Sequence, residues 1–228
     1  TGNRDLIRAI NRALILNKIK TRGQISRAEI ARETGLSPAT VTGISADLLA
    51  EGLLQEETGE SQGGRPPILL SLAPNGGYVI GAKIMETAIY FSLIDLEMNL
   101  VFEQLIETSD YSPNSILEAI ASGTEKILVE KKIPKSKLLG IGIGVAGVLD
   151  FKAGILHHSP ILGWKAVPFK EMLESRMHLP VYIDNDVNTL VVAERVFGVG
   201  ERSRNFIVVT IGRGLGLGMV LNGEIYRG

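Results

Sequence analysis

Residues 25–54, ISRAEIARETGLSPATVTGISADLLAEGLL, determine the fold of the amino-terminal part of the chain. Ser26, with Glu29 three residues later, is a capping box, and it predicts a short helix that ends at Gly35. Ser37 is a typical N-cap for a second helix, which begins directly after it. Two helices separated by a tight turn that contains glycine predict a helix-turn-helix.

A further helix is predicted before this stretch and a hairpin after it. Apolar residues recur at helical spacing over residues 4–20. Residues 53–57 and 68–72 are strand-like, and the polar, glycine-rich residues 58–64 separate them. This hairpin corresponds to a wing, so we expect residues 1–73 to form a winged helix-turn-helix DNA-binding domain.

The winged-helix hypothesis places particular side chains on DNA. The second helix of the motif would enter the major groove, where short side chains hydrogen-bond base edges or touch a thymine methyl group. An arginine at the corner of the wing would enter a narrow, A·T-rich minor groove. The predicted DNA-contacting residues are Ser26, Arg27, Ser37, Ala39, Thr40, Thr42 and Arg65.

The distribution of charge supports DNA binding only weakly. Residues 1–36 hold eight Lys and Arg against three acids, whereas residues 37–64 hold five acids and no Lys or Arg. The second helix of the motif therefore brings no positive charge to a phosphate. A three-helix module that contacts another protein instead of DNA stays open as an alternative.

The composition is that of an ordinary folded protein. The chain has 228 residues, of which 45% are hydrophobic and 21% charged, with a net charge of −1 and no cysteine. The absence of cysteine excludes a disulfide framework and a cysteine-built zinc site within these residues. The polar start of the sequence and its short, glycine-broken apolar runs favour a cytoplasmic protein with no membrane contact.

From residue 78 onward the pattern changes to strands and helices. Three consecutive strands are predicted over residues 78–107, followed by a helix over residues 113–132 and an apolar strand over residues 138–145. Further strands then alternate with helices. This order is typical of a mixed sheet covered by helices, and we expect residues 74–228 to form an α/β domain.

Three stretches of this domain contain residue types suited to a ligand. Residues 184–188, DNDVN, stand where a strand ends and a helix begins, a position suited equally to ligand binding and to helix capping. The alternating glycines of residues 212–218, GRGLGLG, are compatible with a phosphate cradle or with a plain tight turn. His157 and His158 have neither cysteine nor a carboxylate cluster nearby, so no metal ligand is predicted.

Taken together, these stretches resemble the ROK family of repressors, open reading frames and kinases, and in particular its xylose, glucose and N-acetylglucosamine repressors. The resemblance implies a two-lobed, actin/hexokinase-like (ribonuclease H-like) α/β fold that holds a sugar between its lobes, with the second lobe incomplete in this sequence. It rests on residues 25–54, GGRPPILLSLAP (63–74), LLGIGIGVAGVLD (138–150), PILGW (160–164), LPVYIDNDVNTLVVAERVFGVG (179–200) and VTIGRGLGLGMVLNGEIYRG (209–228).

The resemblance also implies a sugar site. Asn185 and Asp186 correspond to the pair that contacts sugar hydroxyls in the family, and Gly147 to a position close to the sugar. Residues 83–87, KIMET, correspond to the Asp-x-Gly-Gly-Thr turn that wraps ATP phosphates in family kinases, but side chains replace the glycines here. In residues 212–218, Arg and Leu replace a Thr and a Gly of the second phosphate loop. Two altered loops favour a repressor over a kinase.

We therefore expect a sugar-responsive repressor that binds double-stranded operator DNA as a homodimer or larger assembly, with no catalytic residue. The first alternative is an ATP-dependent sugar kinase with an added DNA-binding domain. The second is a repressor controlled by a protein partner, because Ile161 stands where many relatives have Asn. The resemblance places a further sugar-binding Glu and His, and a His/Cys₃ zinc site, beyond residue 228, so no cofactor is expected within these residues.

Overall fold

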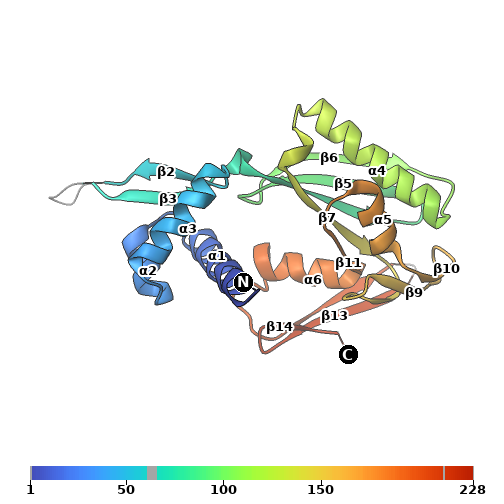
Figure 1. Cartoon of the computed structure of the whole chain (residues 1–228). Coiled ribbons are helices and arrows are strands. Elements are labelled where there is room, and N and C mark those ends of the chain that lie inside the picture. The colour runs from blue at the N-terminus through green and yellow to red at the C-terminus, as the bar shows by residue number, and fades with distance from the viewer. Residues whose placement is uncertain (1, 61–65, 213, 228) are drawn as a thin grey trace. The chain divides into compact units, whose positions relative to one another are not determined.

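The computed structural model describes residues 2–60, 66–212 and 214–227 (Figure 1). The chain divides into an amino-terminal unit, residues 1–78 with 94–100, and a carboxy-terminal unit, residues 79–93 with 101–228. Among the helices described, none has the length and apolar character needed to cross a membrane.

The amino-terminal unit consists of three helices and a small antiparallel sheet. Its elements are α1 (Gly2–Arg22), β1 (Ile25–Ser26), α2 (Arg27–Thr34), α3 (Pro38–Ala50), β2 (Leu54–Thr58), β3 (Ile68–Leu72) and the 3₁₀ helix η1 (Pro74–Gly76). β3 lies between β1 and β2 and pairs with both in antiparallel register. The helices predicted on either side of Gly35 and the two strands predicted after them are therefore present.

One apolar core holds these elements together. Ile15 of α1, Ile30 of α2, Val41 and Leu48 of α3 and Leu70 of β3 are fully buried in it. Burying one such side chain stabilises a fold by about 1.5–3 kcal/mol relative to leaving it exposed. The core therefore fixes α2 and α3 relative to each other and to the hairpin.

The boundaries of α2 follow from its capping groups. The Ser26 hydroxyl accepts the backbone N–H of Glu29, and the Glu29 carboxylate accepts the backbone N–H of Ser26, as the capping box predicts. Gly35 ends the helix in the left-handed region with φ 71°, and its N–H donates to the carbonyl of Ala31.

The carboxy-terminal unit is a mixed α/β structure. Its elements are β4 (Tyr78–Ile84), β5 (Ala88–Asp95), β6 (Leu100–Glu107), α4 (Pro113–Glu130), η2 (Lys135–Lys137), β7 (Leu138–Val145), β8 (Val148–Asp150), β9 (Ile155–Ser159), β10 (Trp164–Val167), α5 (Phe169–Met177), β11 (Val181–Asn185), α6 (Asp186–Phe197), β12 (Phe206–Ile211), β13 (Leu215–Leu221) and β14 (Glu224–Tyr226). The main sheet has the order β11-β7-β4-β5-β6, and β11 runs parallel to β7.

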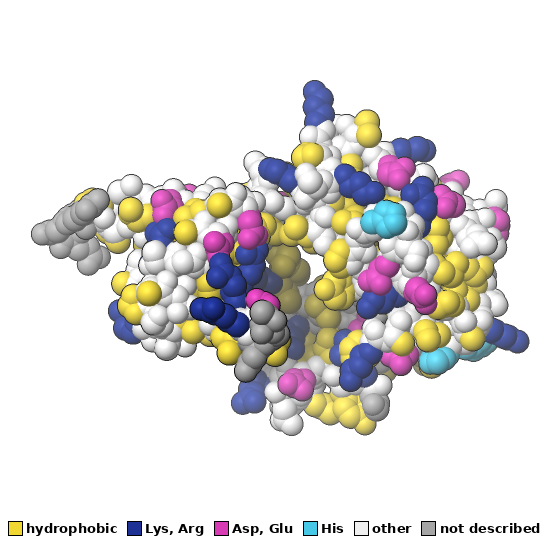
Figure 2. Space-filling view, viewed as in Figure 1, with side chains coloured by type: hydrophobic (Ala, Val, Ile, Leu, Met, Phe, Trp, Pro, Cys, Tyr) yellow, Lys and Arg dark blue, Asp and Glu magenta, His cyan; other side chains and the backbone are white. Residues whose placement is uncertain are grey.

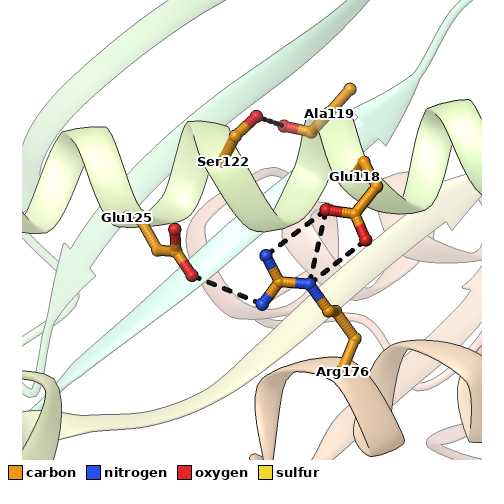
Figure 3. Close-up of polar contacts among 5 residues, drawn as sticks. All are labelled: Glu118, Ala119, Ser122, Glu125 and Arg176. Atoms are coloured by element: carbon orange, nitrogen blue, oxygen red, sulfur yellow. Dashed lines mark hydrogen bonds and ion pairs between the residues drawn. The ribbon is translucent and has the colours of Figure 1, made fainter.

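Helices α4 and α5 lie side by side in this unit (Figure 1). Figure 3 shows Arg176 of α5 between Glu118 and Glu125 of α4, with its Nε 3.2 Å from Glu118 Oε1 and its Nη1 3.4 Å from Glu125 Oε1. The hydrogen bond to Glu118 raises the pKa of the Arg176 guanidinium above its ordinary value. Because all three side chains are solvent-accessible, this cluster contributes little to stability.

Residues 148–167 form three short strands that the sequence pattern did not predict. They make a separate antiparallel sheet of order β10-β9-β8, which follows β7 in the chain. None of the three exceeds five residues, and a β-bulge falls between Val148 and Leu149. Short, irregular strands show too little alternation to be recognised from sequence.

Residues 212–218 were compatible with a phosphate cradle or with a plain tight turn, and the second half of the stretch lies in strand β13. A Cβ atom on Gly216 would lie 2.4 Å from the side chain of Val187, and one on Gly218 would lie 2.5 Å from the side chain of Val191. Both valines belong to α6. The alternating glycines thus allow β13 to pack closely on α6.

Candidate functional site

A cleft of about 860 Å³ lies in the carboxy-terminal unit, where β7 and β11 of the main sheet end. The start of α6 and the hairpin of β12 and β13 complete its walls. Ala146, Leu149, Ile161, Thr210, Leu217 and Tyr226 are among the residues that line it. All three predicted sugar-binding residues, Gly147, Asn185 and Asp186, are among the lining residues. The carboxyl ends of parallel strands are the usual place for a ligand in such folds.

Asp184 directly precedes Asn185, and both of its carboxylate oxygens accept hydrogen bonds from other residues of the chain. Its Oδ1 accepts the side-chain amide of Asn188 at 2.9 Å and the backbone N–H of Asn185 at 2.8 Å. Its Oδ2 accepts Nη2 of Arg227 at 2.6 Å. Arg227 also lines the cleft, and it was not among the predicted site residues. The two partners are 43 residues apart, so no local pattern connects them.

Asn185 acts as the N-cap of α6. Its Oδ1 accepts the backbone N–H of Val187 at 2.9 Å, and its Nδ2 donates to the carbonyl of Gly147 at 3.0 Å. Capping, the alternative considered for this stretch, is thus what the side chain of Asn185 does in the structure. A ligand that bound Asn185 would have to share or replace these hydrogen bonds.

Asp186 is the exception among the polar residues at this end of β11. It is half-buried and lines the cleft, and its carboxylate makes no hydrogen bond or ion pair within the part of the chain that the structure describes. As the first residue of α6, it stands where the helix dipole favours negative charge. A partly buried carboxylate with unsatisfied acceptors is suited to sugar hydroxyls, which are hydrogen-bond donors.

Gly147 connects β7 to β8 with φ 149°, a conformation that residues with a side chain rarely adopt. A Cβ atom there would lie 2.6 Å from the carbonyl oxygen of His158. The fold itself therefore requires glycine at this position, and the Gly147 carbonyl holds Asn185 in place.

Residues 83–87, expected from the resemblance to correspond to the first phosphate loop of family kinases, cover the end of β4 and the connection to β5. The N–H of Met85 donates to the carbonyl of Ala88 at 2.9 Å and closes this connection. Met85 and Glu86 are half-buried, and neither is among the residues that line the cleft.

In the amino-terminal unit, the predicted DNA-contacting residues differ in whether the fold already uses their side chains. Ser26 and Ser37 are N-caps. The hydroxyl groups of Thr40 and Ser37 are hydrogen-bonded to each other, with their oxygens 2.8 Å apart. Ala39 and Thr42 are exposed on α3. Arg65 lies outside the described residues.

The predicted arginine contact, Arg27, is paired within the unit. Its Nη2 lies 2.5 Å from Glu56 Oε1 of β2, and Arg12 makes a bidentate pair with Glu51 at the end of α3. The pair with Glu51 raises the pKa of Arg12 and lowers that of Glu51. Figure 2 shows Lys and Arg side chains of this unit beside Asp and Glu side chains. The basic excess of residues 1–36 is thus offset by the acids that follow it.

Within residues 2–60, 66–212 and 214–227, no three His, Cys, Asp or Glu side chains come together as metal ligands.

The comparisons with known proteins agree on a family. A putative xylose repressor of Caldicellulosiruptor sp. (strain Rt8B.4) is 36% identical over the whole of this chain, which spans 57% of that protein. A solved ROK family transcriptional regulator, a homologue of the E. coli MLC protein, matches the fold of 97% of this chain and 57% of its own, with a TM-score of 0.84 at 24% identity.

A kinase is also similar to part of the chain. A ROK family glucokinase from Streptomyces griseus, solved in complex with glucose and AMPPNP, is 29% identical over 67% of this chain and 47% of its own, with a TM-score of 0.60. The sequence model of the ROK family matches residues 79–228, well over half of this sequence. The chain belongs to the ROK family.

Proposed function

We propose that the protein is a sugar-responsive transcriptional repressor. Residues 1–73 would be its winged helix-turn-helix DNA-binding domain, and residues 74–228 would belong to its ROK domain. The observation that carries the proposal is the similarity to a repressor over the whole chain, including the helices and hairpin that precede the ROK match. We further propose that the protein acts in the cytoplasm.

DNA binding would use the exposed side of α3. Ala39 and Thr42 lie there with Gly43 and Ala46, so no long side chain keeps the helix axis away from base edges. Ser26 and Ser37 would contribute less to base recognition, since their hydroxyls already accept backbone N–H groups. Thr40 and Arg27 would contact DNA only by exchanging their present partners. Arg65 would act from the wing.

Sugar binding would depend chiefly on Asp186. Its carboxylate has no competing partner among the described residues, whereas Asn185 and Gly147 hold each other in the cleft wall. We propose that Asp186 accepts hydrogen bonds from two sugar hydroxyls. Asn185 and Gly147 would shape the wall against which the sugar ring lies.

A sugar kinase is the second candidate, favoured by the similarity to a glucokinase over two thirds of the chain. The geometry of two loops opposes it. Residues 83–87 cover the end of β4 and the connection to β5, with side chains at Met85 and Glu86, and Gly216 and Gly218 of β13 pack on α6. In both stretches, side chains replace glycines whose bare backbone lets the loops of family kinases approach phosphates. ADP release in the presence of ATP and sugar would identify this activity.

A homodimer would bind two half-sites about 34–36 Å apart, or a multiple of that distance. A sugar then releases DNA only if it binds the DNA-bound and the released conformation of the protein with different affinities.

The test is the affinity for a duplex selected from random DNA by the protein, measured by fluorescence anisotropy with and without xylose, glucose, N-acetylglucosamine and cellobiose. We expect one sugar to weaken binding at least about tenfold, the effect of 1.4 kcal/mol. Selection of no duplex, or no response to any sugar, would contradict the proposal.

A further inference from the structure

We propose that Arg227 is a positioning residue for sugar binding in the cleft, an inference that rests on the proposed function. Its guanidinium donates to Asp184 Oδ2 at 2.6 Å and lies 4.2 Å from the centre of the Phe151 ring. All three residues border the cleft. The Asp184 side chain is 18% exposed and that of Arg227 is 31% exposed, so the carboxylate is mostly buried while the guanidinium keeps contact with solvent.

The position of Arg227 connects two parts of the cleft wall. Arg227 directly follows β14, and Asp184 lies at the end of β11. Phe151 follows β8, so the guanidinium is held between three segments that are distant in the sequence. A planar guanidinium can stack on a ring and donate to a carboxylate at the same time, which an ammonium group does less well.

The effect on the sugar would be transmitted through Asp184. Because Oδ2 of Asp184 is held by Arg227, Oδ1 is directed to the backbone N–H of Asn185 and to Asn188. These two bonds fix the first turn of α6, and Asp186 is the first residue of that helix. Arg227 would thus orient Asp186 without touching the sugar.

Charge gives a second reason for the pair. Asp184 and Asp186 both line the cleft, and two carboxylates in a partly desolvated site repel each other. Arg227 neutralises Asp184, and this leaves Asp186 as the carboxylate that lacks a partner among the described residues. Without the guanidinium, a largely buried carboxylate would lose its counter-charge, which is costly.

Calorimetry tests this with the sugar that binds the wild-type protein most tightly. We expect Arg227→Met to weaken binding about tenfold, Arg227→Lys to retain part of the affinity, and Asp184→Asn to weaken it similarly. The double variant with Arg227→Met and Asp184→Asn should lose no more affinity than the single variant with the larger loss, because the two residues act as one pair. Arg202→Met removes an exposed arginine outside the cleft and should bind as the wild type does.

Thermal denaturation shows whether each variant is folded, and Arg227→Lys with Asp184→Asn decide the question if Arg227→Met does not fold. Wild-type sugar affinity in both Arg227→Lys and Asp184→Asn, or additive losses of affinity in the double variant, would overturn the positioning role. If the variants lost affinity for sugar phosphates but not for neutral sugars, Arg227 would instead contact the phosphate directly. If the wild-type protein bound no sugar at all, the proposed function would fail and this inference with it.

Discussion

The two candidate sites differ in how far the fold already uses their polar groups. In the amino-terminal unit, Arg27 is paired with Glu56, and Ser26 and Ser37 cap helices. In the cleft, the same kind of engagement holds for Asp184 and Asn185, but Asp186 has no partner among the described residues. The proposed sugar site therefore has a group ready for a ligand, whereas Arg27, Ser26 and Ser37 of the proposed DNA site would have to exchange internal contacts for external ones.

A side chain can be of a type that suits a ligand and still have its hydrogen-bonding groups occupied by the fold. Residue type and spacing indicate which side chains suit a ligand, but the folded chain decides which of them still have unsatisfied hydrogen-bonding capacity. An engaged group that binds a ligand gains only the difference between two contacts, and net gains of this kind are small. Variants that release an engaged group, or remove one, measure this difference directly.

The largest effect is expected where the fold depends on a backbone position. Gly147→Ala would place Cβ 2.6 Å from the His158 carbonyl at φ 149°, and we expect the free energy of unfolding to fall by about 2–3 kcal/mol. Urea denaturation measures it. Gly163→Ala is the control, because Gly163 also has a positive φ but open space around it, and it should cost about 1 kcal/mol. Equal losses would mean that the contact with His158 is unimportant.

The next effect concerns an engaged polar residue. Asn185→Ala removes the cap of α6 and the bond to Gly147, and should lower the free energy of unfolding by about 1–2 kcal/mol. Asp186→Ala should change it by less than about 0.5 kcal/mol, since no described partner is lost. Urea denaturation measures both changes, and equal losses in the two variants would show that Asn185 and Asp186 do not differ in their contribution to the fold.

A smaller effect is expected at the capping box. Ser26→Ala should cost about 1 kcal/mol of stability, measured by urea denaturation at pH 7. The hydrogen bonds from the Ser26 hydroxyl and backbone N–H lower the pKa of Glu29 below its ordinary value of 4.5.

The lowered pKa of Glu29 fixes how the capping box responds to pH. Its contribution is complete above pH 4.5 and is lost as the pH falls through the folded-state pKa. Glu29→Gln cannot titrate. The stability advantage of the wild-type protein over this variant should therefore shrink below pH 4.5, and an advantage that grew with acid would contradict the assignment.

The smallest effect is expected from releasing Arg27. Glu56→Gln removes its partner, so operator affinity should rise by up to about fivefold, and the salt dependence should steepen by about 0.9 in log–log slope if Arg27 then neutralises one phosphate. Anisotropy titrations at several salt concentrations measure both quantities. Glu57→Gln changes net charge equally but removes a partner of Gln24 instead. Equal gains in both variants would assign the effect to net charge alone.

The sequence predicted the elements with strong local signals. Caps and glycines placed the helices of the amino-terminal unit, and the ends of α2 were correct to the residue. The strands β8 to β10 were missed, because short strands with a bulge lack a clear period. The glycines of residues 212–218 were ambiguous, since close packing on a helix and phosphate binding require the same absence of a side chain.

At the cleft, the sequence identified a segment that lines the cavity but not which of its polar groups have partners within the fold. Asp184, Asn185 and Asp186 are similar in type and adjacent in position. Their roles differ because Arg227 and Gly147, both distant in the sequence, take up the first two. Such pairings depend on tertiary structure, so spacing alone could not separate the free carboxylate from the engaged groups.

The central claim is that the Asp186 carboxylate binds a sugar, and calorimetry with xylose, glucose, N-acetylglucosamine and cellobiose tests it most directly. We predict that one of these sugars binds the wild-type protein with a stoichiometry of one per chain. Asp186→Ala should weaken that binding by about 30-fold or more, the cost of losing charge-assisted hydrogen bonds. Glu171→Ala, which removes an exposed carboxylate of α5 outside the cleft, should leave it unchanged. Wild-type affinity in Asp186→Ala would contradict the claim.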